Sequence, residues 1–148
     1  MKILFVCLGN ICRSPTAEAV YRARFQSEQL VLDSAGTGSW HIGKAPDSRM
    51  LATLAGHGID ASDLRARQFS ATDFAQFDLI IAMDEQNQRD IEQLRPAGAT
   101  TPVRCLLEYS SAYSGDVIDP YYEGEEGFEL CFAQVVSGCE GLWEQLER

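Results

Sequence analysis

Short apolar runs alternate with segments of helical periodicity along the chain, and this alternation constrains the fold more than any other feature. The runs cover residues 3–7, 30–34, 79–83 and 103–107. Runs this short and this apolar are typical of strands that are buried on both faces of a parallel sheet. The sequence therefore predicts an α/β fold, a single-domain three-layer sandwich in which a four-stranded parallel sheet carries helices on both faces.

The segments between the runs carry apolar side chains at helical spacing. Before the first of them stands Ser14-Pro15, a serine suited to a helix N-cap and a proline suited to the first helical position. The four predicted helices are marked by Ala17, Val20, Tyr21 and Phe25; by Met50, Leu51, Leu54 and Ala55; by Ile91 and Leu94; and by Phe128, Cys131, Phe132, Val135, Val136, Cys139, Leu142, Trp143 and Leu146.

The charge of the chain narrows the classes of partner. Twelve Lys and Arg residues stand against twenty-two Asp and Glu residues, which gives a formal net charge of −10. A nucleic-acid binder usually presents a basic surface, and an anionic membrane repels an acidic protein. We therefore expect neither a nucleic-acid nor a membrane partner, although a local pocket for a small anion is compatible with this charge.

The cysteines predict the compartment. The five cysteines form an odd set without CxxC pairs, and they are Cys7, Cys12, Cys105, Cys131 and Cys139. Neither a disulfide framework nor a zinc site is indicated, so we expect a reduced, cytoplasmic protein without a metal. No apolar stretch approaches the roughly 20 residues that a bilayer span needs. We interpret Cys105, Cys131 and Cys139 as packing residues.

The loop after the first run carries the chemistry, and it reads Cys7-Leu8-Gly9-Asn10-Ile11-Cys12-Arg13-Ser14-Pro15. Its length allows successive backbone N–H groups to surround one anion at a helix N-terminus. Gly9 and Asn10 tolerate the left-handed backbone that such a curl requires. Arg13 can grip an oxyanion with two donors, and the positive field favours the thiolate form of Cys7. The alternative is a buried strand cysteine followed by a capping turn.

A thiolate that attacks phosphorus needs an acid to protonate the departing oxygen. The best candidate lies in Asp119-Pro120-Tyr121-Tyr122, where proline rigidifies the turn and two tyrosines can line an aromatic slot. Taken alone, Asp-Pro is a turn signal. Combined with the thiol loop, it predicts a general acid at Asp119.

These residues resemble the low-molecular-weight protein tyrosine phosphatase family over residues 1–148. The resemblance rests on residues 3–6, the loop 7–15, Asp33-Ser34-Ala35-Gly36-Thr37, Ala66-Arg67-Gln68, Met83-Asp84 and Asp119-Pro120-Tyr121-Tyr122. It implies a phosphocysteine intermediate on Cys7, a phosphate clamp at Arg13, and Asp119 as general acid and then base. The resemblance implies neither a metal nor a cofactor. The implied substrates are phosphotyrosine proteins and small aryl phosphates. Phosphate and other oxyanions are expected to bind in the loop and to inhibit.

The resemblance assigns supporting roles as well. Loop support is expected from Leu8, Gly9, Asn10, Ile11, Cys12, Ser14 and Ser34, and a substrate slot from Leu8, Trp40, Tyr121 and Tyr122. It also implies a reversible disulfide between Cys7 and Cys12 under oxidation; the alternative is that Cys12 is a small buried apolar residue. The exposed tyrosines are compatible with a monomer or a weak homodimer.

The chain departs from the family pattern at one point. Family members commonly carry a histidine shortly before Ala-Arg-Gln that supports the loop asparagine, and here the stretch Ser62-Asp63-Leu64-Arg65 has none. We therefore expect a less tightly fixed loop, in which Ser34 carries more of the support of Asn10.

Two other functions remain open at this stage. An arsenate reductase can use the same loop and fold, but it needs additional cysteines in a mobile segment after the third strand, and residues 83–87 contain none. A catalytically silent phosphotyrosine-binding module is expected to lack Cys7 or Asp119, and both are present.

Overall fold

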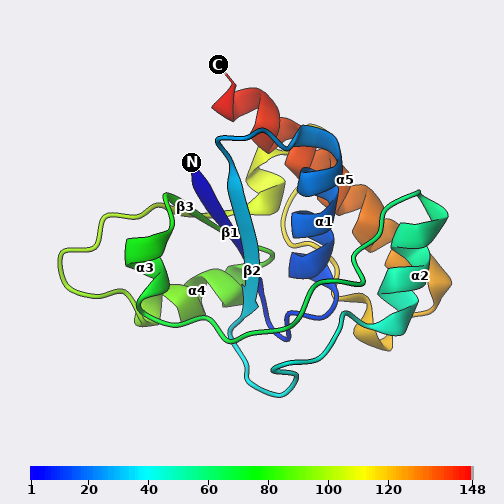
Figure 1. Cartoon of the computed structure of the whole chain (residues 1–148), viewed down its shortest axis with the longest axis horizontal. Helices are drawn as coiled ribbons and strands as arrows, with labels where there is room; N and C mark the ends of the chain where they lie inside the picture. Colours follow the sequence, from blue (N-terminus) through cyan, green and yellow to red (C-terminus); the bar gives the residue numbers. More distant parts are fainter. Residues whose placement is uncertain (148) are drawn as a thin grey trace.

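The computed structural model describes residues 1–147 and contains one parallel sheet with the strand order β2-β1-β3-β4 (Figure 1). The strands are β1 (Lys2–Cys7), β2 (Val31–Gly36), β3 (Leu79–Ala82) and β4 (Val103–Cys105). The helices are α1 (Arg13–Phe25), α2 (Ser48–Gly56), α3 (Asp73–Gln76), α4 (Glu85–Gln93) and α5 (Glu125–Leu146), with 3₁₀ turns η1 (Leu106–Tyr109) and η2 (Pro120–Tyr122). The predicted α/β class with four parallel strands is confirmed; α3 was not predicted. None of the helices in residues 1–147 has the length and apolar character of a membrane span.

Helices cover both faces of the sheet, as predicted. Along β1, alternate side chains enter different cores: Ile3 and Phe5 pack with α1, α2 and α5, whereas Leu4 and Val6 pack with α3 and α4. Figure 1 shows these two groups of helices on opposite sides of the strands. All four side chains are fully buried, and each such burial contributes about 1.5–3 kcal/mol. The central strand therefore anchors the loop that follows it.

The predicted strands differ from the observed ones at the edges of the sheet. The expectation of burial on both faces is wrong for β2, where Val31 is 50% exposed. On the side away from β1, this strand has a bridge partner only at Gly36, which pairs with Gln68, so its first half lacks a neighbour there. The last predicted run also ends early, because residues 106–107 belong to η1 rather than to β4.

The C-terminal helix tolerates two glycines because η1 lies against it. A Cβ at Gly141 would overlap the carbonyl oxygen of Tyr109, so only glycine allows this approach. The predicted apolar stripe is largely confirmed, since its residues from Phe128 to Leu142 are buried or partly buried. Leu94 is an exception to the predicted helix patterns: it lies just beyond α4 and is exposed.

The topology places one loop at a switch point of the sheet. The chain leaves β1 for β2 on one side and later returns to β3 on the other side of β1. In such sheets, ligands bind beyond the carboxyl ends of the strands at this point. The loop between β1 and α1 lies there.

Candidate active site

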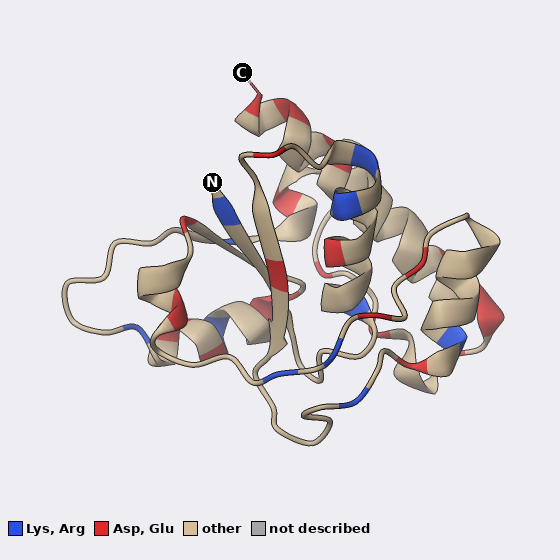
Figure 2. Cartoon of the chain, viewed as in Figure 1, with Lys and Arg blue, Asp and Glu red and all other residues tan. Residues whose placement is uncertain are grey.

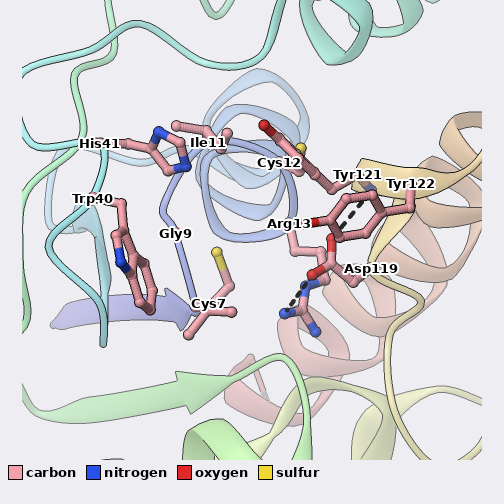
Figure 3. A pocket seen from close by; sticks show the side chains of 11 residues that line it. Cys7, Gly9, Ile11, Cys12, Arg13, Trp40, His41, Asp119, Tyr121 and Tyr122 are labelled. Carbon is pink, nitrogen blue, oxygen red and sulfur yellow. Dashed lines mark hydrogen bonds and ion pairs between the residues drawn. The ribbon is translucent and has the colours of Figure 1, made fainter.

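A cavity of about 490 Å³ opens beyond the carboxyl end of β1 (Figure 3). The residues that line it are Cys7, Leu8, Gly9, Ile11, Cys12, Arg13, Trp40, His41, Asp119, Tyr121 and Tyr122. All of them except His41 belong to the predicted site, and they come from three separate segments of the chain. The remaining predicted residues, Asn10, Ser14 and Ser34, do not line the cavity but are buried.

The sulfur of Cys7 accepts a hydrogen bond from the loop that follows it and lies within hydrogen-bond distance of a hydroxyl of α1. The backbone N–H of Asn10 donates to Sγ at 3.3 Å, and the hydroxyl oxygen of Ser14 lies 3.0 Å from the same atom. Donors that converge on sulfur stabilise its anionic form, which is the nucleophilic form of a cysteine.

Ser14 does not cap α1 as predicted. The helix begins at Arg13, with Cys12 in the N-cap position and no side-chain cap. The Ser14 hydroxyl lies instead between Cys7 Sγ and the carbonyl oxygen of Ala35, 3.3 Å away. Because the sulfur and this carbonyl offer buried acceptors, tertiary contacts outweigh the local preference of serine for a cap.

The curl of the loop requires a left-handed backbone at one position and the absence of a Cβ at another. Asn10 has a φ of 57°, the left-handed conformation predicted for it, whereas the same prediction is wrong for Gly9, whose φ is not positive. Gly36 lies opposite Cys7 in the β1–β2 register, and a Cβ there would lie 2.7 Å from the carbonyl oxygen of Leu8. Gly36 is therefore part of the support of this loop, a role that the sequence analysis missed.

Arg13 is buried and anchored at the floor of the cavity. Its Nη1 donates to Asp84 Oδ2 at 2.6 Å and to the carbonyl oxygen of Val117 at 3.3 Å. Burial lowers the pKa of Arg13, but Cys7 and the hydrogen bond to Asp84 outweigh it, so the pKa is raised above its usual value. The guanidinium is thus a permanent charge in a fixed position.

Asp84 was missed as a site residue, although the sequence held a signal for it. An acidic residue directly after the β3 run lies at the carboxyl edge of a strand that neighbours β1, where parallel sheets place functional side chains. Its contact with Arg13 spans 71 positions, so no local pattern could show it.

Asp119 lies at the mouth of the cavity. Its side chain is 45% exposed, and its Oδ2 lies 3.6 Å from Nη2 of Arg13. Its Oδ1 accepts from the backbone N–H of Tyr121 at 3.2 Å, which caps the turn η2, and Pro120 occupies the first position of that turn. The predicted acid is therefore oriented toward Arg13 by its own turn.

Aromatic rings form the sides of the cavity. Figure 3 shows Trp40 and His41 on one side of Cys7 and Tyr121 with Tyr122 on the other. Trp40 is 66% exposed, as predicted for a slot residue. His41 was missed, although it is adjacent to Trp40 in the loop after β2; its ring lies 6.4 Å from that of Tyr121 across the cavity.

The cysteines are all free thiols. Cys12 lines the cavity together with Cys7, and burial, followed by the charges of Asp47 and Cys7, raises its pKa far above the usual value. Cys105, Cys131 and Cys139 are buried, in line with their interpretation as packing residues.

The amide of Asn10 is satisfied without a histidine. Its Nδ2 donates to Ser14 Oγ at 2.8 Å and to Ser34 Oγ at 3.0 Å, while its Oδ1 accepts from the backbone N–H of Arg67 at 3.0 Å. The Ser34 hydroxyl in turn donates to Glu18 Oε1 at 2.8 Å. A buried chain of hydrogen bonds thus runs from Glu18 to the loop, with Ser34 in the supporting position that the sequence predicted.

Replacing Asn10 or Ser34 tests this chain of hydrogen bonds. We expect Asn10→Ala to lower kcat/KM for an aryl phosphate about tenfold to a hundredfold, because it removes three hydrogen bonds and places alanine at a positive φ. Ser34→Ala removes one partner and is expected to cost about threefold to tenfold. Asn10→Gly, which accepts the positive φ, separates strain from lost hydrogen bonds. Unchanged turnover in both alanine variants contradicts the supporting role.

Glu18 predicts a pH dependence of stability. Burial raises its pKa from 4.5 to about 7, against the opposing hydrogen bond from Ser34. Between these values the folded chain holds a proton that the unfolded chain has released, so the contribution of Glu18 to stability falls as the pH rises from 4.5 to about 7. Glu18→Gln keeps an acceptor for the Ser34 hydroxyl and removes this pH-dependent decrease in stability.

The measurement is urea unfolding of the wild type and Glu18→Gln at pH 5 and pH 8. We expect the free energy of unfolding of the variant, relative to the wild type, to rise by about 2–3 kcal/mol between these two pH values. The exposed Glu28→Gln removes the same charge elsewhere and serves as the control. Parallel curves for the wild type and both variants disprove the assignment.

The positive field of the site is local. Lys and Arg residues are spread over separate elements of an acidic chain with a net charge of −10 (Figure 2). At the cavity, Arg13 and the backbone N–H groups at the start of α1 supply the attraction for an anion. Within residues 1–147, His, Cys, Asp and Glu side chains do not form a group of three that could hold a metal ion.

Comparisons with known proteins agree with this geometry. The family model "Low molecular weight phosphotyrosine protein phosphatase" matches residues 2–148. The Schizosaccharomyces pombe protein of that name is 45% identical and covers 92% of this chain and 90% of its own length. A protein tyrosine phosphatase from Entamoeba histolytica, solved with Hepes in the active site, has a TM-score of 0.94 at 39% identity and covers 99% of this chain and 97% of its own.

A Drosophila arginine phosphatase is also similar, with a TM-score of 0.90 at 33% identity over 100% of this chain and 99% of its own. These matches extend over almost the whole chain. The chain therefore belongs to the low molecular weight phosphotyrosine protein phosphatase family.

Proposed function

We propose that the chain, as one catalytic domain over residues 1–148, hydrolyses phosphotyrosine in proteins and small aryl phosphates through a phosphocysteine on Cys7. One observation carries this proposal: a hydrogen-bonded thiol, a buried guanidinium and an exposed carboxyl surround the same cavity. Each of the three groups has a separate task in the transfer of a phosphoryl group.

In the first step, Cys7 thiolate attacks phosphorus in line with the ester oxygen. The sulfur–phosphorus bond forms as the phosphorus–oxygen bond breaks, and the carboxyl of Asp119 gives its proton to the departing tyrosyl oxygen. Arg13 and the loop amides hold the three equatorial oxygens, where fixed donors stabilise the charge that develops in the transition state.

In the second step, water hydrolyses the phosphocysteine. The carboxylate of Asp119 takes a proton from this water, the oxygen bonds to phosphorus, and Cys7 departs as a thiolate that the Asn10 N–H and Ser14 can stabilise. Inorganic phosphate remains bound to Arg13 until it leaves, so phosphate and similar oxyanions are expected to compete with substrate.

The walls of the cavity favour a flat aromatic leaving group. Trp40, Tyr121 and Leu8 contribute apolar surface to the cavity, and an aryl ring can pack between them. The side chain of phosphoserine is shorter than that of phosphotyrosine, so its phosphate group extends less far toward Arg13. A phosphoarginine places a guanidinium between these walls where phosphotyrosine places an aromatic ring, and it is therefore the critical comparison substrate.

The two other functions are less well supported. Residues 83–87, where an arsenate reductase was expected to need cysteines, contain none, and Asp84 in this segment binds Arg13. A silent binding module has no use for an acid at the cavity mouth, and Asp119 lies there.

The test is phosphate release by the purified wild type from phosphotyrosine, phosphoserine and phosphoarginine peptides, with arsenate reduction measured in parallel. We expect phosphotyrosine to be hydrolysed with the highest kcat/KM. Faster release from phosphoarginine changes the substrate class, thiol-dependent reduction of arsenate without hydrolysis favours the reductase, and binding without hydrolysis favours the module.

We further propose a cytoplasmic protein that is a monomer or a weak homodimer, with Cys12 as the disulfide partner of Cys7. Five free thiols support a reducing compartment, and the 93% exposed Tyr122 supports weak self-association. Sedimentation across a range of concentrations tests the assembly. Peroxide treatment followed by dithiothreitol tests the disulfide, because Cys12→Ser is expected to lose the recovery of activity.

A further inference from the structure

A side chain outside the cavity contacts one of its walls. Arg49, in the first turn of α2, places its guanidinium carbon 5.4 Å from the ring centre of Tyr121 and 4.8 Å from that of Phe128. Tyr121 belongs to η2 and Phe128 to α5, so one guanidinium contacts two elements besides its own. A cation within about 6 Å of a ring centre is attracted by the ring, and the planar guanidinium does this well.

The position of Arg49 is fixed from the opposite side by Asp47. Its Nε donates to Asp47 Oδ1 at 3.1 Å and its Nη2 to Oδ2 at 2.8 Å, so both carboxylate oxygens are engaged. Asp47 is fixed as well: its Oδ1 accepts from the backbone N–H of Arg49 at 2.8 Å, and its own N–H donates to the carbonyl oxygen of Ile11 at 2.8 Å. The guanidinium is thus tied to the cysteine loop.

The Tyr121 ring is connected to the acid through its own backbone. Its N–H donates to Asp119 Oδ1, and both residues belong to the rigid Asp-Pro turn. A ring that is free to rotate leaves the slot without a wall. Arg49 restrains this ring from outside the cavity, since it is not among the residues that line it.

We propose that Arg49 is a positioning residue of this active site, which holds the Tyr121 ring as a substrate wall and links the Asp119 turn to the cysteine loop through Asp47 and Ile11. The inference rests on the proposed phosphatase function and deepens it. The arginine contacts no reacting atom, so its effect on substrate must pass through Tyr121.

The experiment is a double-mutant cycle on the full chain, with a phosphotyrosine peptide and p-nitrophenyl phosphate as substrates. The variants are Arg49→Ala, Tyr121→Ala and the double variant. We expect Arg49→Ala to raise KM about fivefold to tenfold with kcat within about twofold of the wild type. In the Tyr121→Ala background the same change is expected to alter KM less than about twofold, because the ring that Arg49 holds is gone.

Arg95→Ala is the matched control. Arg95 also pairs with a carboxylate through Nε and Nη2, at 2.8 and 2.9 Å from Glu92, and also lies 4.8 Å from a ring centre, that of Phe74. Arg95 lies on the opposite face of the sheet, because Phe74 belongs to the core on the side of α3 and α4. We expect its KM to remain that of the wild type even if its melting temperature falls.

Arg49→Lys keeps the charge but not the two-pronged grip on Asp47, and an intermediate KM is expected. If Arg49→Ala fails to fold, Arg49→Lys replaces it in the cycle. An equal rise in KM with and without the Tyr121 ring overturns the proposal, as does a rise no larger than that of Arg95→Ala. A wild type that hydrolyses neither substrate refutes the proposed function itself, an outcome distinct from both.

Discussion

Replacing Cys7 by serine is expected to lower the rate of phosphotyrosine hydrolysis by at least about 10⁴-fold. A serine hydroxyl is far less acidic than a thiol, so the donors that stabilise a thiolate at this position cannot make it an anion near neutral pH. The change replaces one atom, and the loop around it keeps its hydrogen bonds. Chemistry is therefore lost without loss of the site.

Retained binding is the second half of this prediction. Arg13 stays anchored by Asp84 and the loop amides remain in place, so the Cys7→Ser variant is expected to bind a phosphotyrosine peptide within a fewfold of the wild-type affinity. Isothermal titration measures the affinity, and phosphate release measures the rate. Cys105→Ser, a buried thiol on β4, is the control. Activity of Cys7→Ser close to that of the wild type rules out the phosphocysteine mechanism.

The sequence predicted the parts of the site that follow from local rules. The spacing of five residues between a thiol and an arginine, directly before a helix, predicted a curled backbone. The positive φ of Asn10 confirms the position of that curl. The parallel sheet followed from the alternation of apolar runs with helical patterns. In both cases residues close in sequence contain the whole signal.

The missed residues depend on contacts between distant segments. Asp84, at the N-cap of α4, holds Arg13, and Gly36, at the end of β2, allows the close approach of the cysteine loop. Glu18 reaches this loop through Ser34. For Ser14, a distant contact made a local prediction wrong: the hydroxyl lies against the buried sulfur of Cys7 instead of capping α1. Only the order β2-β1-β3 brings these groups together, and the sequence pattern does not specify which strands are neighbours.

Removal of Asp119 is expected to have the second-largest effect. Asp119→Ala deprives the departing tyrosyl oxygen of its proton, and kcat/KM for a phosphotyrosine peptide is expected to fall about 10²-fold to 10³-fold. Tyrosine is a poor leaving group as an anion, since its pKa is about 10. A nitrophenolate is a much weaker base and leaves without protonation. For p-nitrophenyl phosphate, the Asp119→Ala change is therefore expected to lower kcat/KM far less.

This dependence on the leaving group distinguishes a lost acid from a disturbed site. Asp119 also lies 3.6 Å from Arg13, and its removal takes away one charge beside the clamp. The hydrogen bond of 2.6 Å to Asp84 keeps the guanidinium in place, so phosphate binding is expected to survive. Because kcat/KM reports the steps up to the first chemical one, it is the quantity to compare across phenols of graded acidity.

The control for this series is Asp116→Ala, which removes a nearby exposed carboxylate that binds the backbone of Glu85 instead of Arg13. For the wild type and this control, kcat/KM is expected to depend weakly on the acidity of the phenol. For Asp119→Ala it is expected to depend steeply, because negative charge then accumulates on the departing oxygen. An equal loss for all phenols indicates instead that Arg13 has moved, and that result removes the assignment of Asp119 as the acid.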